Sequence, residues 1–263
     1  MDLGLKDKRA FVAGSSRGLG FATALTLARE GCSVAVNSRE EDKAKAAAEK
    51  ITNETGTQAH GFAGDVSDAS TAETLIKSVV ESLGGLDILI TNAGGPPAGS
   101  FEAFDEQAWQ KAVDSSLMSH VRLIRAALPH LRNSSTPSVL TVTSYTVKQP
   151  LPNLVLSNSV RAATVGLTKS LAMELGKENI RFNSIMPGWT MTERVQELMA
   201  FRAKNNNTTV EDEIARQTAE IPLGRVGQPQ EFANAAVFLV SPAASFIHGV
   251  SLAVDGGITK SAF

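Results

Sequence analysis

Short apolar runs alternate with longer segments of helical periodicity along almost the whole chain. Several of these apolar runs are continuous, which is typical of strands that helices cover on both faces. A regular alternation of strand and helix predicts an α/β fold with a parallel sheet. We therefore expect strands near residues 8–13, 33–37, 58–63, 86–91, 138–143, 180–186 and 250–254, and helices near 19–30, 40–55, 69–83, 105–132, 153–177 and 229–240.

The segment 191–226 interrupts this alternation and is polar in its middle, at residues 204–208. A new helix is expected to begin at Thr209, because Thr209 and Asp212 resemble a capping box. An insertion after the sixth strand lies at the carboxyl edge of the sheet, where ligands bind in open α/β folds. We interpret it as a helical lid over a substrate pocket; a surface insertion without such a role is the alternative. The chain shows no linker and no internal repeat, so residues 1–263 are expected to form one domain.

Three glycines, Gly14, Gly18 and Gly20, lie between the first apolar run and the first helix. Glycine tolerates positive φ and lets a ligand approach the backbone closely. A helix that begins at such a turn directs free N–H groups and the positive end of its dipole at the ligand. The strand, turn, helix and second strand together predict a phosphate or pyrophosphate site, with an ordinary glycine-rich turn as the alternative.

The composition narrows the class of protein. A formal net charge of -2 gives no reason to expect nucleic acid or an anionic membrane as a partner. The single cysteine, Cys32, excludes an internal disulfide and is expected to be buried at the start of a strand. The N-terminus lacks a secretory segment and no apolar run is long enough to span a membrane, so we expect a cytoplasmic protein. No cluster of histidine, cysteine and carboxylate has metal-ligand spacing, so no metal site is predicted.

The helix expected over 153–177 has apolar or small residues nearly all round, from Ala162 and Val165 to Leu171 and Leu175. A surface helix of a monomer shows one apolar stripe only. The second face of this helix is therefore expected to be buried against another subunit of a symmetric homo-oligomer.

Several short motifs follow one another along the chain. They are the glycine-rich turn at 13–20, Gly64-Asp65-Val66, Asn92-Ala93-Gly94, Asn183, Pro187-Gly188, Thr192, Arg225-Val226-Gly227 and Val254-Asp255-Gly256-Gly257. Their order resembles the short-chain dehydrogenase/reductase family, and 3-oxoacyl-carrier-protein-reductase-like members in particular. The resemblance covers almost the whole chain and implies a single-domain Rossmann fold with a seven-stranded parallel sheet, a nicotinamide dinucleotide and a homotetramer or homodimer.

The end of the second strand indicates which dinucleotide is bound. An acidic residue there would accept hydrogen bonds from a free ribose 2′-hydroxyl, whereas arginines suit a 2′-phosphate. The residues at this position are Asn37, Ser38 and Arg39, and Arg17 is also within reach of a 2′-phosphate. We therefore favour NADP(H) over NAD(H). The resemblance implies cofactor contacts by Gly14, Ser16, Arg17, Gly18, Leu19, Gly20, Asn37, Ser38, Arg39, Asp65, Val66, Asn92, Ala93, Gly94, Pro187, Gly188, Thr190 and Thr192.

The resemblance also implies a catalytic tetrad, and this chain departs from it at three of the four positions. Ser144 matches the serine, but Ser157 stands in place of the tyrosine acid and Arg161 in place of the lysine. Ser116 stands where the family has an asparagine. Ser157 keeps a hydroxyl that a bridging water could extend. Arg161 keeps the positive charge and could still bind the nicotinamide ribose, but it gives up no proton in a relay.

The one tyrosine of the chain, Tyr145, follows Ser144 directly and is either a substitute acid or a wall of the pocket. Lys148 in the same loop is either a substrate anchor or a solvated side chain. Histidine side chains are candidates for proton transfer in general, but His120, His130 and His248 are expected to be structural.

We expect an NADP(H)-dependent oxidoreductase that acts on a small carbonyl or alcohol substrate with an altered proton donor. Two alternatives remain open from the sequence. One is a dinucleotide-binding sensor or assembly protein without turnover, and the other is a non-redox reaction on the same fold.

Overall fold

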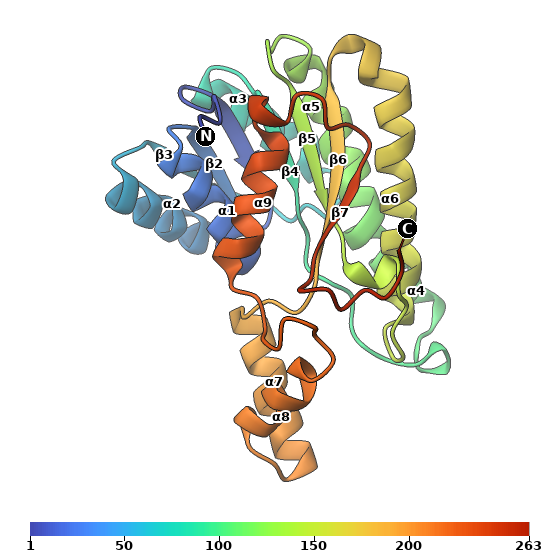
Figure 1. Cartoon of the computed structure of the whole chain (residues 1–263). Coiled ribbons are helices and arrows are strands. Elements are labelled where there is room, and N and C mark those ends of the chain that lie inside the picture. Colours follow the sequence, from blue (N-terminus) through green and yellow to red (C-terminus); the bar gives the residue numbers. More distant parts are fainter. Residues whose placement is uncertain (263) are drawn as a thin grey trace.

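A computed structural model describes residues 1–262 of the chain. Seven strands form one sheet in the order β3-β2-β1-β4-β5-β6-β7, and all neighbouring strands pair in parallel (Figure 1). The expected seven-stranded parallel sheet is therefore confirmed, with each strand within a residue or two of its expected bounds. The strands are β1 (Arg9–Val12), β2 (Ser33–Ser38), β3 (Ala59–Ala63), β4 (Ile88–Thr91), β5 (Ser138–Val142), β6 (Arg181–Pro187) and β7 (Ser251–Val254).

The α-helices pack on both faces of the sheet or extend beyond its carboxyl edge. They are α1 (Gly18–Arg29), α2 (Glu41–Thr55), α3 (Thr71–Leu83), α4 (Glu106–Val113), α5 (Ser119–Leu131), α6 (Val155–Leu175), α7 (Glu193–Asn206), α8 (Val210–Thr218) and α9 (Pro229–Val240).

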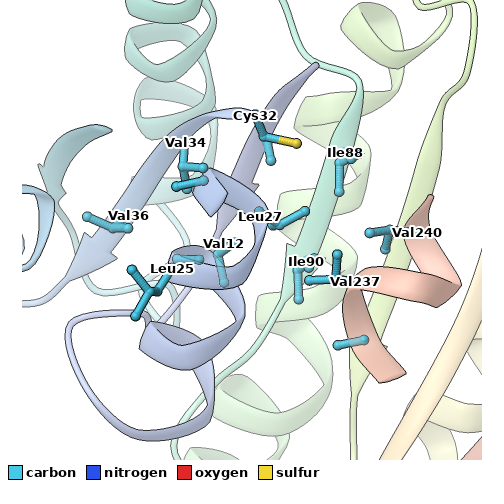
Figure 2. Packing of buried hydrophobic residues seen from close by; sticks show 14 of the residues in the cluster. Val12, Leu25, Leu27, Cys32, Val34, Val36, Ile88, Ile90, Val237 and Val240 are labelled. Carbon is cyan, nitrogen blue, oxygen red and sulfur yellow. The ribbon is translucent and has the colours of Figure 1, made fainter. Parts of the chain in front are cut away.

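Two buried clusters of apolar side chains lie on the two faces of the sheet. Figure 2 shows the first, in which Val12 and Ile90 of the strands pack with Leu27 of α1 and Val237 of α9. The second cluster joins strand residues such as Phe11 to α3, α5 and the C-terminal part of α6. Neighbouring residues of one strand point to opposite faces, so a strand covered on both sides must be apolar throughout.

The single helix expected over 105–132 is wrong in one respect. A π-helical turn, Asp114–Met118, separates α4 from α5. Within this turn the carbonyl oxygen of Ser116 accepts a hydrogen bond of 2.6 Å from the Thr164 hydroxyl of α6. Because this carbonyl has a partner outside its own helix, the backbone widens locally, as π-turns do at many functional sites.

Helices α7 and α8 form a pair that projects beyond the carboxyl edge of the sheet (Figure 1). The Thr192 hydroxyl caps α7, and the expected capping box of Thr209 and Asp212 begins α8. Glu213 of α8 is buried and accepts hydrogen bonds from Asn206 and Thr208, so the end of one helix is tied to the start of the next.

No α-helix in the described part of the chain is long and apolar enough to cross a membrane. The 21-residue helix α6 instead leaves Ala162, Ala163, Gly166 and Met173 exposed along one side of the single chain. This exposed face agrees with the expected homo-oligomer, which stays a prediction.

Candidate active site

A cavity of about 520 Å³ follows the carboxyl ends of β3, β2, β1 and β4. It lies at the switch point of the sheet, where successive strands depart to opposite sides of β1 and where open α/β sheets bind ligands. The structure brings together at this cavity the predicted cofactor residues Gly14, Ser16, Arg17, Asn37, Ser38, Arg39, Asp65, Val66, Asn92, Ala93 and Gly94.

The glycine-rich turn has a backbone that only glycine adopts without strain. Gly14 and Gly18 have φ values of 56° and 59°. A methyl group at Gly20 would overlap the carbonyl oxygen of Gly14, so α1 and the turn pack backbone to backbone. Helix α1 begins with no side-chain cap on its first N–H groups. These free donors belong to Gly18, Leu19 and Gly20, directly after the cavity-lining Ser16 and Arg17, and a helix start of this kind fits a pyrophosphate.

Two asparagines position this turn. Asn37 is buried, and its Oδ1 accepts a hydrogen bond of 3.2 Å from the Gly14 N–H while its Nδ2 donates to Gly64. The Asn92 amide donates to the carbonyl oxygen of Gly14 at 3.0 Å. Both side chains are therefore engaged with the backbone, and they shape the cavity through the turn.

One end of the cavity is cationic. Arg17 and Arg39 are exposed there, and the sequence prediction missed a third cation, Lys43, because it looks like a solvated residue of α2. Arg39 makes no hydrogen bond or ion pair within residues 1–262. Lys43 Nζ lies 2.6 Å from Glu40 Oε1, and this hydrogen bond lowers the pKa of the Glu40 carboxyl. The available signal was that Lys43 lies in the first turn of α2, directly after the end of β2 that carries Arg39.

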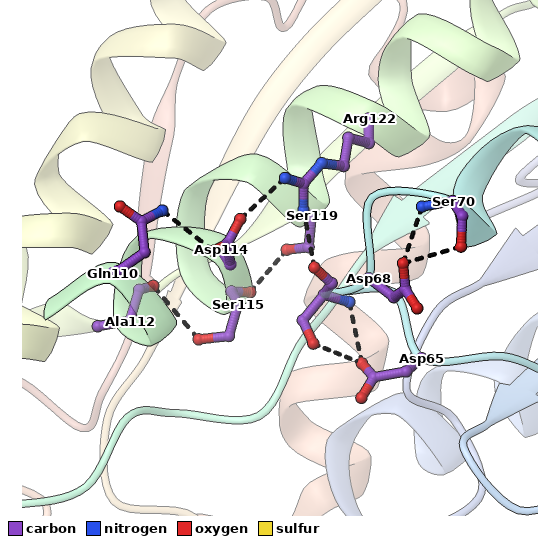
Figure 3. Close-up of polar contacts among 10 residues, drawn as sticks. Asp65, Asp68, Ser70, Gln110, Ala112, Asp114, Ser115, Ser119 and Arg122 are labelled. Carbon is purple, nitrogen blue, oxygen red and sulfur yellow. Dashed lines mark hydrogen bonds and ion pairs between the residues drawn. The ribbon is translucent and has the colours of Figure 1, made fainter. Parts of the chain in front are cut away.

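The loop after β3 is held against the π-turn by Arg122, which the sequence prediction also missed. The Arg122 guanidinium donates to the Ser67 carbonyl oxygen at 2.7 Å and to the Asp114 carboxylate at 2.8 Å. Figure 3 shows Arg122 between Asp114 and the loop that carries Asp65 and Asp68. Asp65 in turn accepts hydrogen bonds from the N–H and the hydroxyl of Ser67. This network fixes Asp65 and Ser115, which both line the cavity.

The remaining predicted cofactor residues lie beside this cavity rather than on its wall. Thr192 comes close to the turn, since its methyl carbon would lie 3.5 Å from a Cβ built at Gly18. Thr190 is buried, and its hydroxyl donates to the Gly188 carbonyl oxygen at 3.4 Å. The residues outside the cavity lining are Gly18, Leu19, Gly20, Pro187, Gly188, Thr190 and Thr192.

Ser144 and Ser157 both keep a hydroxyl proton free to donate. Ser144 Oγ accepts hydrogen bonds from the N–H of Thr146, at 3.2 Å, and from its hydroxyl, at 3.1 Å. These two donors orient the Ser144 oxygen and leave its own O–H unused within the described residues. Ser157 is half-buried in the first turn of α6, and in residues 1–262 its hydroxyl has no hydrogen-bond partner.

Arg161 lies one helical turn after Ser157 and is buried. One of its terminal nitrogens donates to the carbonyl oxygens of Val142, at 3.2 Å, and Thr143, at 3.0 Å, directly before Ser144. No carboxylate pairs with Arg161 within residues 1–262. Burial, with a smaller repulsion from Arg194, lowers the pKa of Arg161 to about 10. The guanidinium still carries a full positive charge at neutral pH.

Tyr145 is buried next to Ser144 in a small apolar cluster with Ile221 and Ile258. Its hydroxyl oxygen accepts a hydrogen bond of 3.1 Å from the Trp189 indole N–H. Burial raises the pKa of the Tyr145 phenol, with smaller opposing and reinforcing effects from its neighbours. This environment is that of a packing residue, because an efficient acid at neutral pH needs a lowered phenol pKa. Lys148, further along the loop, is exposed.

Two of the three histidines named from the sequence have structural contacts. His120 Nδ1 lies 2.6 Å from the Thr91 hydroxyl oxygen in the core between β4 and α5. Burial, and then the charge of Arg161, lower the pKa of His120 to about 3. His248 Nε2 donates to the Ala172 carbonyl oxygen, and its Nδ1 accepts from the Phe182 N–H. His130 lies in the last turn of α5.

Comparison with known proteins shows similarity over almost the full chain. A family model described as enoyl-(acyl carrier protein) reductase matches residues 13–259. The chain is 32% identical over 253 residues to the 3-oxoacyl-[acyl-carrier-protein] reductase FabG of Staphylococcus aureus, covering 95% of this chain and 98% of the relative.

Solved structures are also similar to this chain over almost its full length. L-sorbose reductase from Gluconobacter frateurii, complexed with NADPH and L-sorbose, is 32% identical with a TM-score of 0.96, over 99% of this chain and 100% of that one. An NADPH-bound short-chain oxidoreductase from Pseudomonas aeruginosa PAO1, described as containing an atypical catalytic center, is 29% identical with a TM-score of 0.88, over 97% and 98% of the two chains.

Proposed function

Because this chain belongs to the short-chain dehydrogenase/reductase family, we propose that it reduces a small carbonyl substrate with NADP(H) and an altered proton donor. Family membership makes the protein an oxidoreductase that acts on a carbonyl or alcohol group with a nicotinamide dinucleotide. Our proposal adds four points to this: the cofactor carries a 2′-phosphate, named residues are catalytic, helices α7 and α8 form a lid, and the chain forms a homo-oligomer.

The choice of NADP(H) rests on the cationic end of the cavity. Arg17, Arg39 and Lys43 line it together with Glu40, whose carboxylate is engaged by Lys43 at 2.6 Å. Residues 37–39 at the end of β2 carry no carboxylate to accept hydrogen bonds from a free 2′-hydroxyl. Arg39, without a partner in the described residues, is the group best placed to gain an ion pair from the 2′-phosphate. The NADPH complexes of two similar structures support the same choice.

The nicotinamide, when bound, supplies or accepts the hydride. The backbone N–H groups of the glycine-rich turn bind the pyrophosphate, and Thr192 closes the turn from the side of α7. Ser144, with its free O–H, donates a hydrogen bond to the carbonyl oxygen of the substrate. Arg161 stabilises negative charge that develops on that oxygen, since its own charge has no acidic partner in residues 1–262. Ser157 holds a water molecule that delivers the proton in place of a phenol.

Helices α7 and α8 act as a lid over the substrate, because they extend from the carboxyl edge beside Ser144 and the glycine-rich turn. The exposed face of α6 packs against a second subunit in a homodimer or homotetramer. A cytoplasmic location remains an expectation from the sequence.

The replacement of tyrosine and lysine by Ser157 and Arg161 favours one second candidate, a dinucleotide-binding protein without turnover. Oxidation of NADPH in the presence of a panel of ketones, sugars and oxo acids, followed at 340 nm, separates the two. Turnover with any member of the panel supports the reductase. Tight NADPH binding with no turnover on the full panel supports the binding protein.

Arg39→Ala tests the cofactor assignment. Loss of a charge-assisted contact is expected to weaken NADPH binding by roughly 10- to 100-fold and NADH binding by less than about twofold, measured by calorimetry. Lys77→Ala, which removes an exposed cation of α3 away from the cavity, is the matched control and should change neither affinity. Equal weakening of both cofactors by Arg39→Ala would remove the 2′-phosphate from this position.

A further inference from the structure

Two arginines from distant parts of the chain converge on Gly95, just after β4. A Cβ built at Gly95 would lie 3.2 Å and 3.4 Å from the two terminal nitrogens of Arg194 and 3.6 Å from a terminal nitrogen of Arg161. Arg161 comes from the first turns of α6 and Arg194 from the first turn of α7. The absence of a side chain at Gly95 leaves room for both guanidinium groups.

The two charges are not neutralised by the protein. Arg161 is 93% buried, with only backbone carbonyl partners, whereas Arg194 is exposed and makes no ion pair or hydrogen bond within residues 1–262. The nearest acids of α7 face elsewhere, since Glu193 points toward Gly18 and Glu197 pairs with Arg17 at 3.8 Å. Repulsion between two like charges costs free energy, less where one of them is in contact with water, and an anion bound between them removes that cost.

The position of the pair indicates which anion it binds. Gly95 and Arg194 line the end of the cavity nearest β5, opposite the end lined by Arg39 and Lys43. A pyrophosphate already has its own donors in the turn and the start of α1. Arg161 is bonded to the carbonyl oxygens of Val142 and Thr143, so its guanidinium lies against the backbone that leads into Ser144, the residue proposed to hold the reacting carbonyl.

We propose that Arg161 and Arg194 form a carboxylate-binding pair and that the substrate is an oxo acid, reduced to the corresponding hydroxy acid. The proposal rests on the proposed reductase function and adds the class of substrate. Arg194 binds the substrate carboxylate from the lid, and Arg161 binds it from the body of the protein. A planar guanidinium suits a carboxylate because it offers two parallel N–H donors. Binding of the acid therefore also draws α7 toward the body.

Matched pairs of substrates test this assignment. The wild-type protein is expected to reduce short 2-oxo and 3-oxo acids with kcat/KM about 100-fold above that for the corresponding amides, which lack the charge. Arg194→Gln is expected to raise KM for the acid at least tenfold and to change KM for the amide by less than twofold. The NADPH dissociation constant, measured by calorimetry, should stay unchanged. Lys204→Gln, which removes an exposed cation further along α7, is the control and should behave as wild type.

Three results would overturn the proposal. The first is equal activity on acids and amides, the second is an equal effect of Arg194→Gln on both, and the third is weakened NADPH binding, which would assign Arg194 to a cofactor phosphate. If no carbonyl is turned over at all, the reductase function fails separately. Calorimetric titration of an oxo acid and its amide into the NADP⁺-loaded protein then decides the carboxylate site. Tenfold weaker acid binding in Arg194→Gln supports the site, and no acid binding to wild type rejects it.

Discussion

The hydroxyl groups of Ser144 and Tyr145 are neighbours in the chain but have different surroundings. Ser144 accepts two hydrogen bonds from Thr146 and has its O–H free, whereas the Tyr145 oxygen is engaged by Trp189 in an apolar cluster. Burial raises the pKa of Tyr145, so its phenol is a weaker acid than free tyrosine. Ser144 is therefore suited to polarise a carbonyl group, and Tyr145 is suited to shape the pocket by packing.

We predict that Ser144→Ala lowers kcat/KM by roughly 100-fold, because it removes a donor to the developing oxyanion. Tyr145→Phe, which keeps the ring and removes the hydroxyl, is expected to change kcat/KM by less than about threefold. Steady-state kinetics with NADPH and the best substrate of the panel measure both. A 100-fold loss in Tyr145→Phe would instead identify Tyr145 as the acid that replaces the missing residue.

Among the elements, the α7–α8 pair is the one held together by polar contacts rather than by a large apolar core. Glu213 is 4% exposed and accepts hydrogen bonds from Asn206 at 3.0 Å, Thr208 at 2.7 Å and Arg216 at 2.9 Å. These bonds, the Asn206 bond first, lower the pKa of the Glu213 carboxyl. A helix pair stabilised in this way can loosen locally without disturbing the sheet.

Glu213→Ala is expected to loosen the lid locally, because it leaves three donors without their acceptor. Amide hydrogen exchange within residues 193–218 should accelerate by roughly tenfold or more, since hydrogen bonds to charged groups each contribute about 1.5–3 kcal/mol. Exchange in the strands should not change. Glu211→Ala is the control, because Glu211 is an exposed acid in the same first turn of α8 and has the same relation to the helix dipole. Acceleration spread over the whole chain would show that the pair is part of the main folding unit.

Across the whole molecule, the buried Thr91–His120 contact links folding to pH. His120 has a pKa of about 3 in the folded chain, against an ordinary value of 6.5, because burial disfavours its charged form. Between these two values the unfolded chain binds a proton that the folded chain does not. The free energy of unfolding therefore falls as the pH is lowered from 6.5 toward 3, and the contribution of His120 is complete above 6.5.

Replacing this histidine should flatten the acid side of the stability curve. In wild type, His120 contributes up to about 1.4 kcal/mol per pH unit to the slope of the unfolding free energy between pH 3 and 6.5. His120→Gln retains a polar side chain beside Thr91 and should lose this contribution. Urea unfolding at a series of pH values measures the difference. His60→Gln on the edge strand β3 is the control and should leave the wild-type slope in place. Parallel curves for His120→Gln and wild type would show that His120 is not the group responsible.

The order of the seven strands, the glycine-rich turn and the capping box of α8 were determined by the sequence alone. Each depends on residues close together in the chain: the period of the apolar positions, glycines with positive φ such as Gly14 and Gly18, and the Thr209–Asp212 pair. The resemblance of ordered motifs also sufficed to select most of the residues that line the cavity, because strand ends in a parallel sheet meet at one edge.

The tertiary structure alone decided how distant side chains meet. The π-turn depends on a hydrogen bond from Thr164 on another helix, and the surroundings of Tyr145 depend on Trp189, 44 residues further along. Arg161 and Arg194 stand 33 positions apart in the sequence, yet both reach Gly95. No local pattern reports such contacts, because they arise from how helices pack on the sheet and not from the conformational preferences of neighbouring residues.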